Sequence, residues 1–228
     1  MSEKTILIFG AGHKLSASIA RLFSKNSFKV YLVARDIGKL KYIENEIGAT
    51  LFEGDVSDLK SVLNVFQSVD KISGSPGIVI FNPSVRIKGA IEQLCSEDVE
   101  KAFRVNIMGA FYVAQQAAIR MTRAGSGSIF FTGATAGIKG FANSSVFAMG
   151  KFSLRGLAQS LARELHPQNI HVGHFVIDGK IQDKSKSEDN SDRGMDPDEL
   201  AKTYLHFHTQ QKSCWSWEVE LRHANESF

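Results

Sequence analysis

The chain has 228 residues, of which 43% are hydrophobic and 22% are charged, and this composition is typical of one soluble globular domain with a sizeable core. Its formal net charge of +3 argues against nucleic-acid or membrane partners. Two cysteines, Cys95 and Cys214, are too few for a disulfide framework, and residues 1–10 lack the pattern of a signal peptide. We therefore expect a cytoplasmic protein.

Apolar segments of strand length alternate with helical patterns along most of the chain. The predicted strands cover residues 5–10, 28–35, 49–55, 77–82, 126–133 and 169–178, and the predicted helices cover 16–26, 37–47, 57–68, 97–123, 146–166 and 197–211. The strands are unbroken apolar runs, as expected when helices cover both faces of a parallel sheet. The pattern predicts one doubly wound α/β domain over residues 1–228, with a flexible loop in the polar segment 183–199.

The turn after the first predicted strand is the expected place for phosphate binding. Gly10 and Gly12 permit a tight turn, and the N–H groups and dipole of the next helix can hold a pyrophosphate. Lys14 and Ser16 depart from the usual dinucleotide fingerprint. A plain strand–turn–helix connection therefore stays open as an alternative.

The end of the second predicted strand bears on the choice of cofactor. Arg35 stands at its tip, followed by Asp36 and Lys39. An arginine at this place suits the 2′-phosphate of NADP(H), because its planar guanidinium matches phosphate, so the sequence favours NADP(H) over NAD(H). A solvated Arg35 paired with Asp36 is the alternative interpretation.

Over nearly its whole length the chain resembles the short-chain dehydrogenase/reductase family. The matching motifs are the glycine turn at 10–16, GDVSD at 54–58, FNPS at 81–84, FRVNIMGAF at 103–111, GSIFFTGATAG at 127–137 and FAMGK at 147–151. The resemblance implies a Rossmann-type, mostly parallel seven-stranded sheet with helices on both faces. It also implies that Asp55 contacts the adenine, that Asn82 lies beneath the cofactor, and that Asn106 and Lys151 are the asparagine and lysine of the catalytic tetrad.

Two tetrad positions of that resemblance lack their hydroxyl groups. The family's tyrosine, four residues before the lysine, corresponds to Phe147, and its serine corresponds to Ala134. In the family the lysine lowers the pKa of the tyrosine, which moves a proton to or from the substrate oxygen. General acid catalysis typically raises a reaction rate by about 10²–10⁴-fold, so its loss strongly slows carbonyl reduction. The residues expected to bind the cofactor are still present.

Other side chains near these positions offer alternative proton donors. The candidates are Thr132 and Thr135 for the serine, Ser144 and Ser145 for the tyrosine, and Asp178 and His174 near the end of the sixth predicted strand. Unperturbed alcohols are poor acids, and such hydroxyls more often cap the ends of strands and helices. The glycine turn also resembles that of enoyl-thioester reductases, whose tyrosine position would be Ser144 here.

The seven histidines show no metal-ligand pattern. His206 and His208 point to different faces of their predicted helix, and His171 and His174 lie on opposite faces of a strand. We therefore predict no metal site.

Two functions stay open at this point. The first is hydride transfer between NADPH and an unknown carbonyl or activated alkene, with the proton coming from water, Asp178 or the substrate. The second is a non-catalytic NADP(H)-bound scaffold or redox sensor. In either case the resemblance implies a homodimer or homotetramer built on the predicted helices 97–123 and 146–166.

Overall fold

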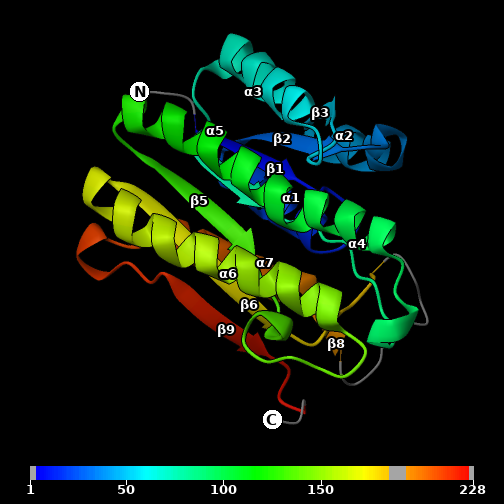
Figure 1. The fold of residues 1–228 in the computed structure, drawn as a ribbon. Coiled ribbons are helices and arrows are strands. Elements are labelled where there is room, and N and C mark those ends of the chain that lie inside the picture. Colours follow the sequence, from blue (N-terminus) through cyan, green and yellow to red (C-terminus); the bar gives the residue numbers. More distant parts are fainter. Residues whose placement is uncertain (1–3, 185–193, 226–228) are drawn as a thin grey trace.

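The computed structural model describes residues 4–184 and 194–225 and confirms the seven-stranded α/β sheet (Figure 1). All six strand pairings are parallel, and the strand order is β3-β2-β1-β4-β5-β6-β9. The strands are β1 (Thr5–Phe9), β2 (Lys29–Ala34), β3 (Thr50–Glu53), β4 (Ile78–Phe81), β5 (Gly127–Thr132), β6 (Ile170–Asp178) and β9 (Glu218–Arg222). The chain order reverses between β1 and β4, which creates a crevice at the carboxyl ends of these two strands.

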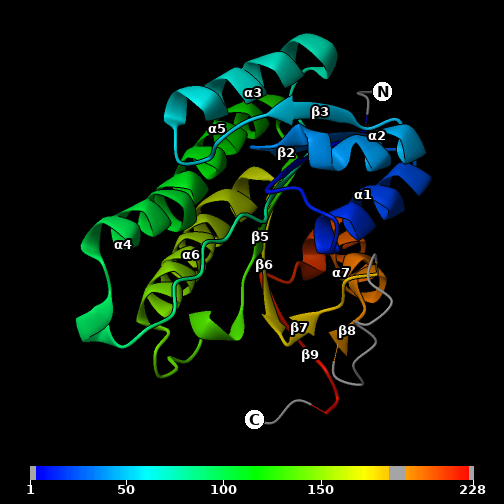
Figure 2. The same ribbon diagram turned by 90° about the vertical axis from the view of Figure 1, so that its right-hand side faces the viewer.

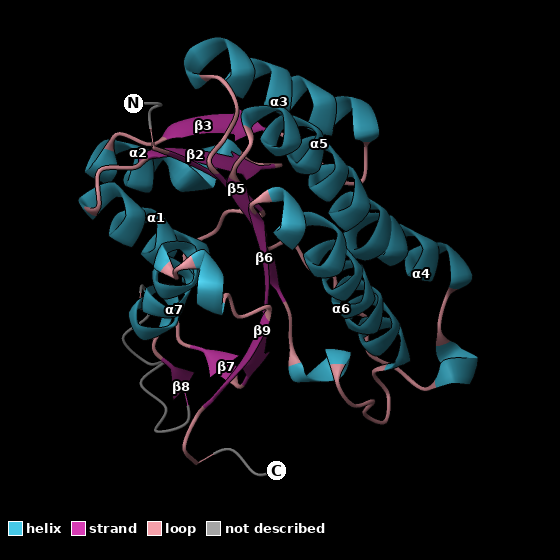
Figure 3. Ribbon diagram, turned by 90° about the vertical axis from the view of Figure 1, so that its left-hand side faces the viewer, coloured by secondary structure: helices cyan, strands magenta, loops and turns pink. Residues whose placement is uncertain are grey.

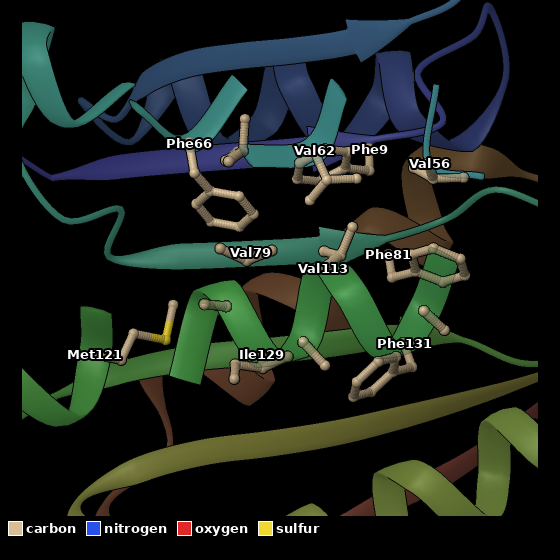
Figure 4. Packing of buried hydrophobic residues seen from close by; sticks show 14 of the residues in the cluster. Phe9, Val56, Val62, Phe66, Val79, Phe81, Val113, Met121, Ile129 and Phe131 are labelled. Carbon is tan, nitrogen blue, oxygen red and sulfur yellow. The ribbon is translucent and has the colours of Figure 1, made fainter. Parts of the chain in front are cut away.

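Helices cover both faces of the sheet (Figures 2 and 3). One face is covered by α3 (Leu59–Ser73), α5 (Gly109–Ala124) and α6 (Ser145–Leu165), and the other by α1 (Leu15–Lys25), α2 (Lys41–Ile47) and α7 (Pro197–Thr209). The strands serve both layers because their side chains alternate. In β1, Leu7 and Phe9 pack into the first layer, shown in Figure 4, whereas Ile6 and Ile8 pack into the second.

The segment predicted as one helix over 97–123 contains an irregular turn. Helix α4 (Ser96–Phe103) continues through a π-helical turn, Arg104–Met108, into α5 without leaving helical backbone angles. Such single π-turns occur frequently at functional sites. This one contains Asn106, whose buried side chain takes part in the site described below.

The C-terminal quarter departs from the sequence prediction. Part of the segment 183–199, expected to be a loop, is regular: β8 (Gly194–Met195) pairs with β7 (Lys180–Ile181), and α7 begins at Pro197. Residues 185–193 of that predicted loop lie outside the described residues. Strand β9 was not predicted because it is an edge strand in which charged residues alternate with Val219 and Leu221. None of the described helices is long and apolar enough to cross a lipid bilayer.

Three histidines are packed at the amino end of the sheet, near α7. The ring of His171 stacks on Trp215 at 4.6 Å, and His166 lies 5.5 Å from His171. His208 is 3.0 Å from the Ser128 hydroxyl. Burial lowers the pKa of all three histidines, that of His208 to about 4. They are therefore neutral in the folded protein near pH 7.

These histidines predict that the protein loses stability in mild acid. The unfolded chain binds protons below its histidine pKa of about 6.5, while the folded protein resists them, so the free energy of unfolding falls as the pH drops from about 7 to about 4. His208 alone accounts for up to about 3 kcal/mol of this loss. Denaturant titrations across this range should show a flatter pH dependence in His208→Asn and an unchanged one in the exposed control His206→Asn. Equal slopes in wild type and His208→Asn would contradict the assignment.

Candidate functional site

A cavity of about 450 Å³ opens at the crevice between the carboxyl ends of β1 and β4. Five segments line it: the turn after β1, the tip of β2 with the residues after it, the residues after β3, the loop after β4, and the π-turn through Val105. Of the predicted cofactor-binding residues, it contains Gly10, Gly12, Arg35, Asp55 and Asn82. Lys14, Ser16 and Lys151 do not line it.

The turn after β1 is fixed by a close approach to the loop after β4. Gly10 has a φ of +74°, and a Cβ atom at this position would lie 2.5 Å from the backbone nitrogen of Pro83. The Gly10 carbonyl accepts a hydrogen bond from Asn82 Nδ2 at 3.0 Å, and the Gly10 N–H donates to Val33 O, also at 3.0 Å. Only glycine satisfies both the conformation and the space.

The rest of this turn is occupied by contacts within the fold. The Gly12 N–H donates to Ser16 Oγ at 2.8 Å, and Lys14 Nζ donates to Ile181 O at 3.3 Å. His13 Nε2 lies 2.9 Å from a carboxylate oxygen of Asp183, whose side chain is 3% exposed. Residues 181–183 therefore lie against the turn, a contact across more than 160 residues that the sequence did not indicate.

The tip of β2 places an arginine at the cavity without an acidic partner. Asp36 accepts from Gly38 N at 3.0 Å and pairs with Lys39 at 3.2 Å, so the Arg35–Asp36 pair considered above does not form. Arg35 is exposed and has no ion-pair partner among the described residues. Asp55, also in the cavity wall, accepts two hydrogen bonds from Ser57 through Oδ1.

Lys151 is a buried cation beside an aromatic ring. Its Nζ donates to Thr132 O at 2.8 Å and lies 5.8 Å from the centre of the Phe147 ring, one helical turn earlier on α6. Burial lowers the pKa of Lys151 to about 8. An ammonium group of this pKa can release a proton close to neutral pH.

Asn106 holds the loop after β4. Its Oδ1 accepts from Val85 N at 2.8 Å, and its Nδ2 donates to Val85 O at 2.7 Å. A Cβ atom at Gly150 would lie 3.1 Å from the Asn106 amide, so α6 also approaches this side chain closely. Asn106 thus links the π-turn, the start of α6 and the wall of the cavity.

Most of the alternative proton donors are engaged in the fold. Thr132 Oγ1 lies 2.9 Å from Tyr204 Oη. The Thr135 hydroxyl donates to Asp178, and the other carboxylate oxygen of Asp178 lies 2.6 Å from an Arg222 nitrogen. The paired Asp178 is therefore unsuited to donate a proton.

His174, the other candidate on β6, is fully buried behind the strand. Its Nδ1 lies 2.9 Å from Glu218, and burial lowers the pKa of its imidazole. Ser144, at the start of α6, makes no side-chain capping bond. His171 stacks on Phe207 of α7, whereas His174 bonds to Glu218 of β9. The described residues contain no cluster of potential metal ligands.

Comparison with known proteins gives the family. Residues 4–191 match the short chain dehydrogenase family, and the chain belongs to it. It is 29% identical over 179 residues to the 3-oxoacyl-[acyl-carrier-protein] reductase MabA of Mycobacterium tuberculosis, covering 78% of this chain and 70% of that one.

Two solved structures show the same fold. A short-chain dehydrogenase from Rhodopseudomonas palustris is 31% identical with a TM-score of 0.85, covering 96% of this chain and 98% of that one. A metagenomic short-chain oxidoreductase in complex with NADP is 23% identical with a TM-score of 0.85, covering 97% of each chain.

The requirement for glycine at position 10 can be tested by the effect of a substitution on the stability of the protein. We expect Gly10→Ala to lower the free energy of unfolding by at least about 2 kcal/mol, because the new methyl group overpacks against Pro83 in a left-handed conformation. Gly12→Ala is the matched control, since no atom lies within 4 Å of a Cβ atom there. Equal losses in the two variants, measured by denaturant unfolding, would show that the close approach at Gly10 does not constrain the turn.

Proposed function

We propose that this protein is an NADP(H)-binding oxidoreductase that transfers a hydride to a carbonyl or an activated alkene. The observation that carries the proposal is the cavity between β1 and β4, which holds the glycine turn, Arg35 and Asp55 at the place where this fold binds dinucleotides. The cavity fits a nucleotide because Gly10 and Gly12 leave its floor without side chains and Arg35 keeps its donors free. NADPH would supply the hydride when bound.

The preference for NADP(H) rests on charge. Arg35 lines the cavity at the tip of β2 and is not neutralised by Asp36, which pairs with Lys39 instead. A guanidinium group with free donors suits the additional 2′-phosphate of NADP(H). The structure of the metagenomic short-chain oxidoreductase contains NADP, which agrees with this choice.

The proton-transfer step differs from that of the family. Phe147 and Ala134 stand where the resemblance places the tyrosine and serine, and neither has an oxygen to donate or polarise. Since Thr135 and Asp178 bond each other, the proton for a developing alkoxide would come from water, from the substrate, or from the Lys151 ammonium with its pKa of about 8. The same loss of oxygens favours a second candidate function, a cofactor-bound scaffold or redox sensor without turnover.

Cofactor binding is tested by titrating the protein with NADPH and, separately, with NADH, following heat or nicotinamide fluorescence. We expect NADPH to bind more tightly, and Arg35→Gln to weaken NADPH binding by roughly tenfold or more while leaving NADH binding nearly unchanged. Lys60→Gln, an exposed residue outside the cavity, is the control for net charge. Failure of the wild-type protein to bind either nucleotide would refute the proposal.

Restoring the two hydroxyl groups separates enzyme from scaffold. If the protein is a scaffold, Phe147→Tyr combined with Ala134→Ser should create reductase activity on a panel of carbonyl compounds that wild type does not reduce. The rate of the double variant should exceed that of wild type by about 10²-fold or more, which is the usual contribution of a general acid. Robust turnover by wild type on any compound of the panel would instead establish the enzyme and exclude the scaffold.

We further propose that the chain forms a homodimer or homotetramer through α5 and α6. Their outer faces expose Phe111, Ile119, Met149 and Phe152 to between 39% and 53%, and apolar hollows lie between the two helices. Contiguous exposed apolar surface of this kind is typical of interfaces. Light scattering should give a mass of at least twice 25.1 kDa, whereas a monomer at all concentrations would exclude the assembly.

A further inference from the structure

Two loops meet beside Phe147, and together they are strongly basic. Residues 82–91 and 133–145 contain Arg86, Lys88 and Lys139 but no acidic residue. The loops are joined by a hydrogen bond from Gly89 N to Asn143 O at 3.1 Å, and they lie at the same end of the molecule in Figures 2 and 3. We call the three exposed side chains the cationic rim.

Arg86 lies directly on the ring of Phe147. Its guanidinium carbon is 5.0 Å from the centre of that ring, and Lys151 Nζ is 5.8 Å from the same point. No carboxylate of the described residues pairs with Arg86. A contact with an aromatic face uses none of the five N–H donors of a guanidinium group. These donors therefore remain available to a ligand.

The position of Arg86 is set by the protein backbone. The preceding residue, Val85, is held at both its N–H and its C=O by the side chain of Asn106, at 2.8 and 2.7 Å. These two hydrogen bonds restrain the backbone beside Arg86. The guanidinium group is therefore carried by a fixed part of the loop. A preorganised cation of this kind binds anions better than one on a mobile segment.

Apolar side chains lie among the cations of the rim. Ile91, Ile138 and Phe141 are 74%, 38% and 48% exposed, and Lys139 Nζ lies 5.6 Å from the centre of the Phe141 ring. A surface that combines exposed apolar groups with cations is complementary to a molecule with an apolar body and an anionic group.

We propose that Arg86 binds the carboxylate or phosphate group of an amphipathic anionic substrate. The oxyanion accepts hydrogen bonds from the Arg86 guanidinium group beside Phe147, and the apolar part of the substrate lies on Ile138 and Phe141. This assignment rests on the proposed function, in that it takes the surroundings of Phe147 and Lys151 as the place where substrate binds. It makes Arg86 a specificity-determining residue for the charge of the substrate.

The test compares probes that have apolar chains of similar length and head groups of different charge. Octanoate, octyl phosphate and the neutral octanamide are each titrated into the full-length protein, with binding followed by calorimetry. At least one anion should bind roughly tenfold or more tightly than octanamide, since a charge-assisted hydrogen bond is stronger than a neutral one. The anion that binds more tightly identifies whether the group recognised is a carboxylate or a phosphate.

Variants then assign the anion preference to Arg86. Arg86→Gln should abolish it, whereas Lys60→Gln, on an exposed part of α3, should retain it. Equal binding of anions and amide by wild type, a preference that persists in Arg86→Gln, or no measurable binding of either anion would each overturn the proposal.

NADPH titration separates this proposal from the proposed function. Arg86 does not line the nucleotide cavity, so Arg86→Gln should bind NADPH as wild type does. A wild-type protein that fails to bind NADPH but still shows anion binding dependent on Arg86 would refute the cofactor and leave the anion site in place. Normal NADPH binding without any anion preference would refute the anion site alone.

Discussion

The loop after β4 is held by two asparagine side chains, and the arrangement of the whole site depends on them. Asn82 donates to the carbonyl of Gly10, which fixes the loop to the turn after β1. Asn106 bonds both backbone groups of Val85, which fixes the same loop to the π-turn between α4 and α5. Amide side chains suit this task because each offers both donors and an acceptor in one plane. The result is a short segment whose residues line the nucleotide cavity at one end and present Arg86 to Phe147 at the other.

Lys151 is costly to the fold, and its surroundings do little to offset the cost. Its only hydrogen-bond partner among the described residues is the Thr132 carbonyl, and burial lowers the pKa of its ammonium from 10.5 to about 8. A shift of this size corresponds to roughly 3 kcal/mol of unfavourable free energy for the charged form. An apolar side chain of similar length would fill the space without that penalty. A cation at this place is therefore easier to explain by what it binds than by what it packs against, which supports a ligand near Phe147.

The sequence predicted the parts of the fold that depend on local periodicity. Strands β1 to β6 are rich in apolar residues, and α1, α6 and α7 show helical spacing, so the sequence predicted where these elements lie and of which type they are. Strand β9 was missed because it is an edge strand in which only every second side chain is apolar. Its charged residues gave the segment the composition of a loop. Of the cofactor-binding residues predicted from the sequence, Gly10, Gly12, Arg35, Asp55 and Asn82 line the cavity. Lys14, Ser16 and Lys151 do not line it, and their contacts within the fold were not predicted. The pairing of Asp178 with Arg222, and of His13 with Asp183, joins residues 44 and 170 positions apart, and no local pattern encodes such contacts.

The two ends of the dinucleotide crevice differ in how far the protein satisfies its own polar groups. Near the phosphate turn, the Gly12 N–H is bonded to Ser16, Lys14 to Ile181 O and His13 to Asp183. A pyrophosphate at this turn would have to replace those contacts, so its net contribution to binding is reduced by what is broken. At the tip of β2, Arg35 has no such partner to give up. The binding free energy of a dinucleotide would therefore be weighted toward its adenosine end, where a 2′-phosphate would meet an unpaired guanidinium group. The distinction between NADPH and NADH is set by this contact with the 2′-phosphate, because the contribution of the part that the two ligands share is the same for both and cancels in the ratio of their affinities.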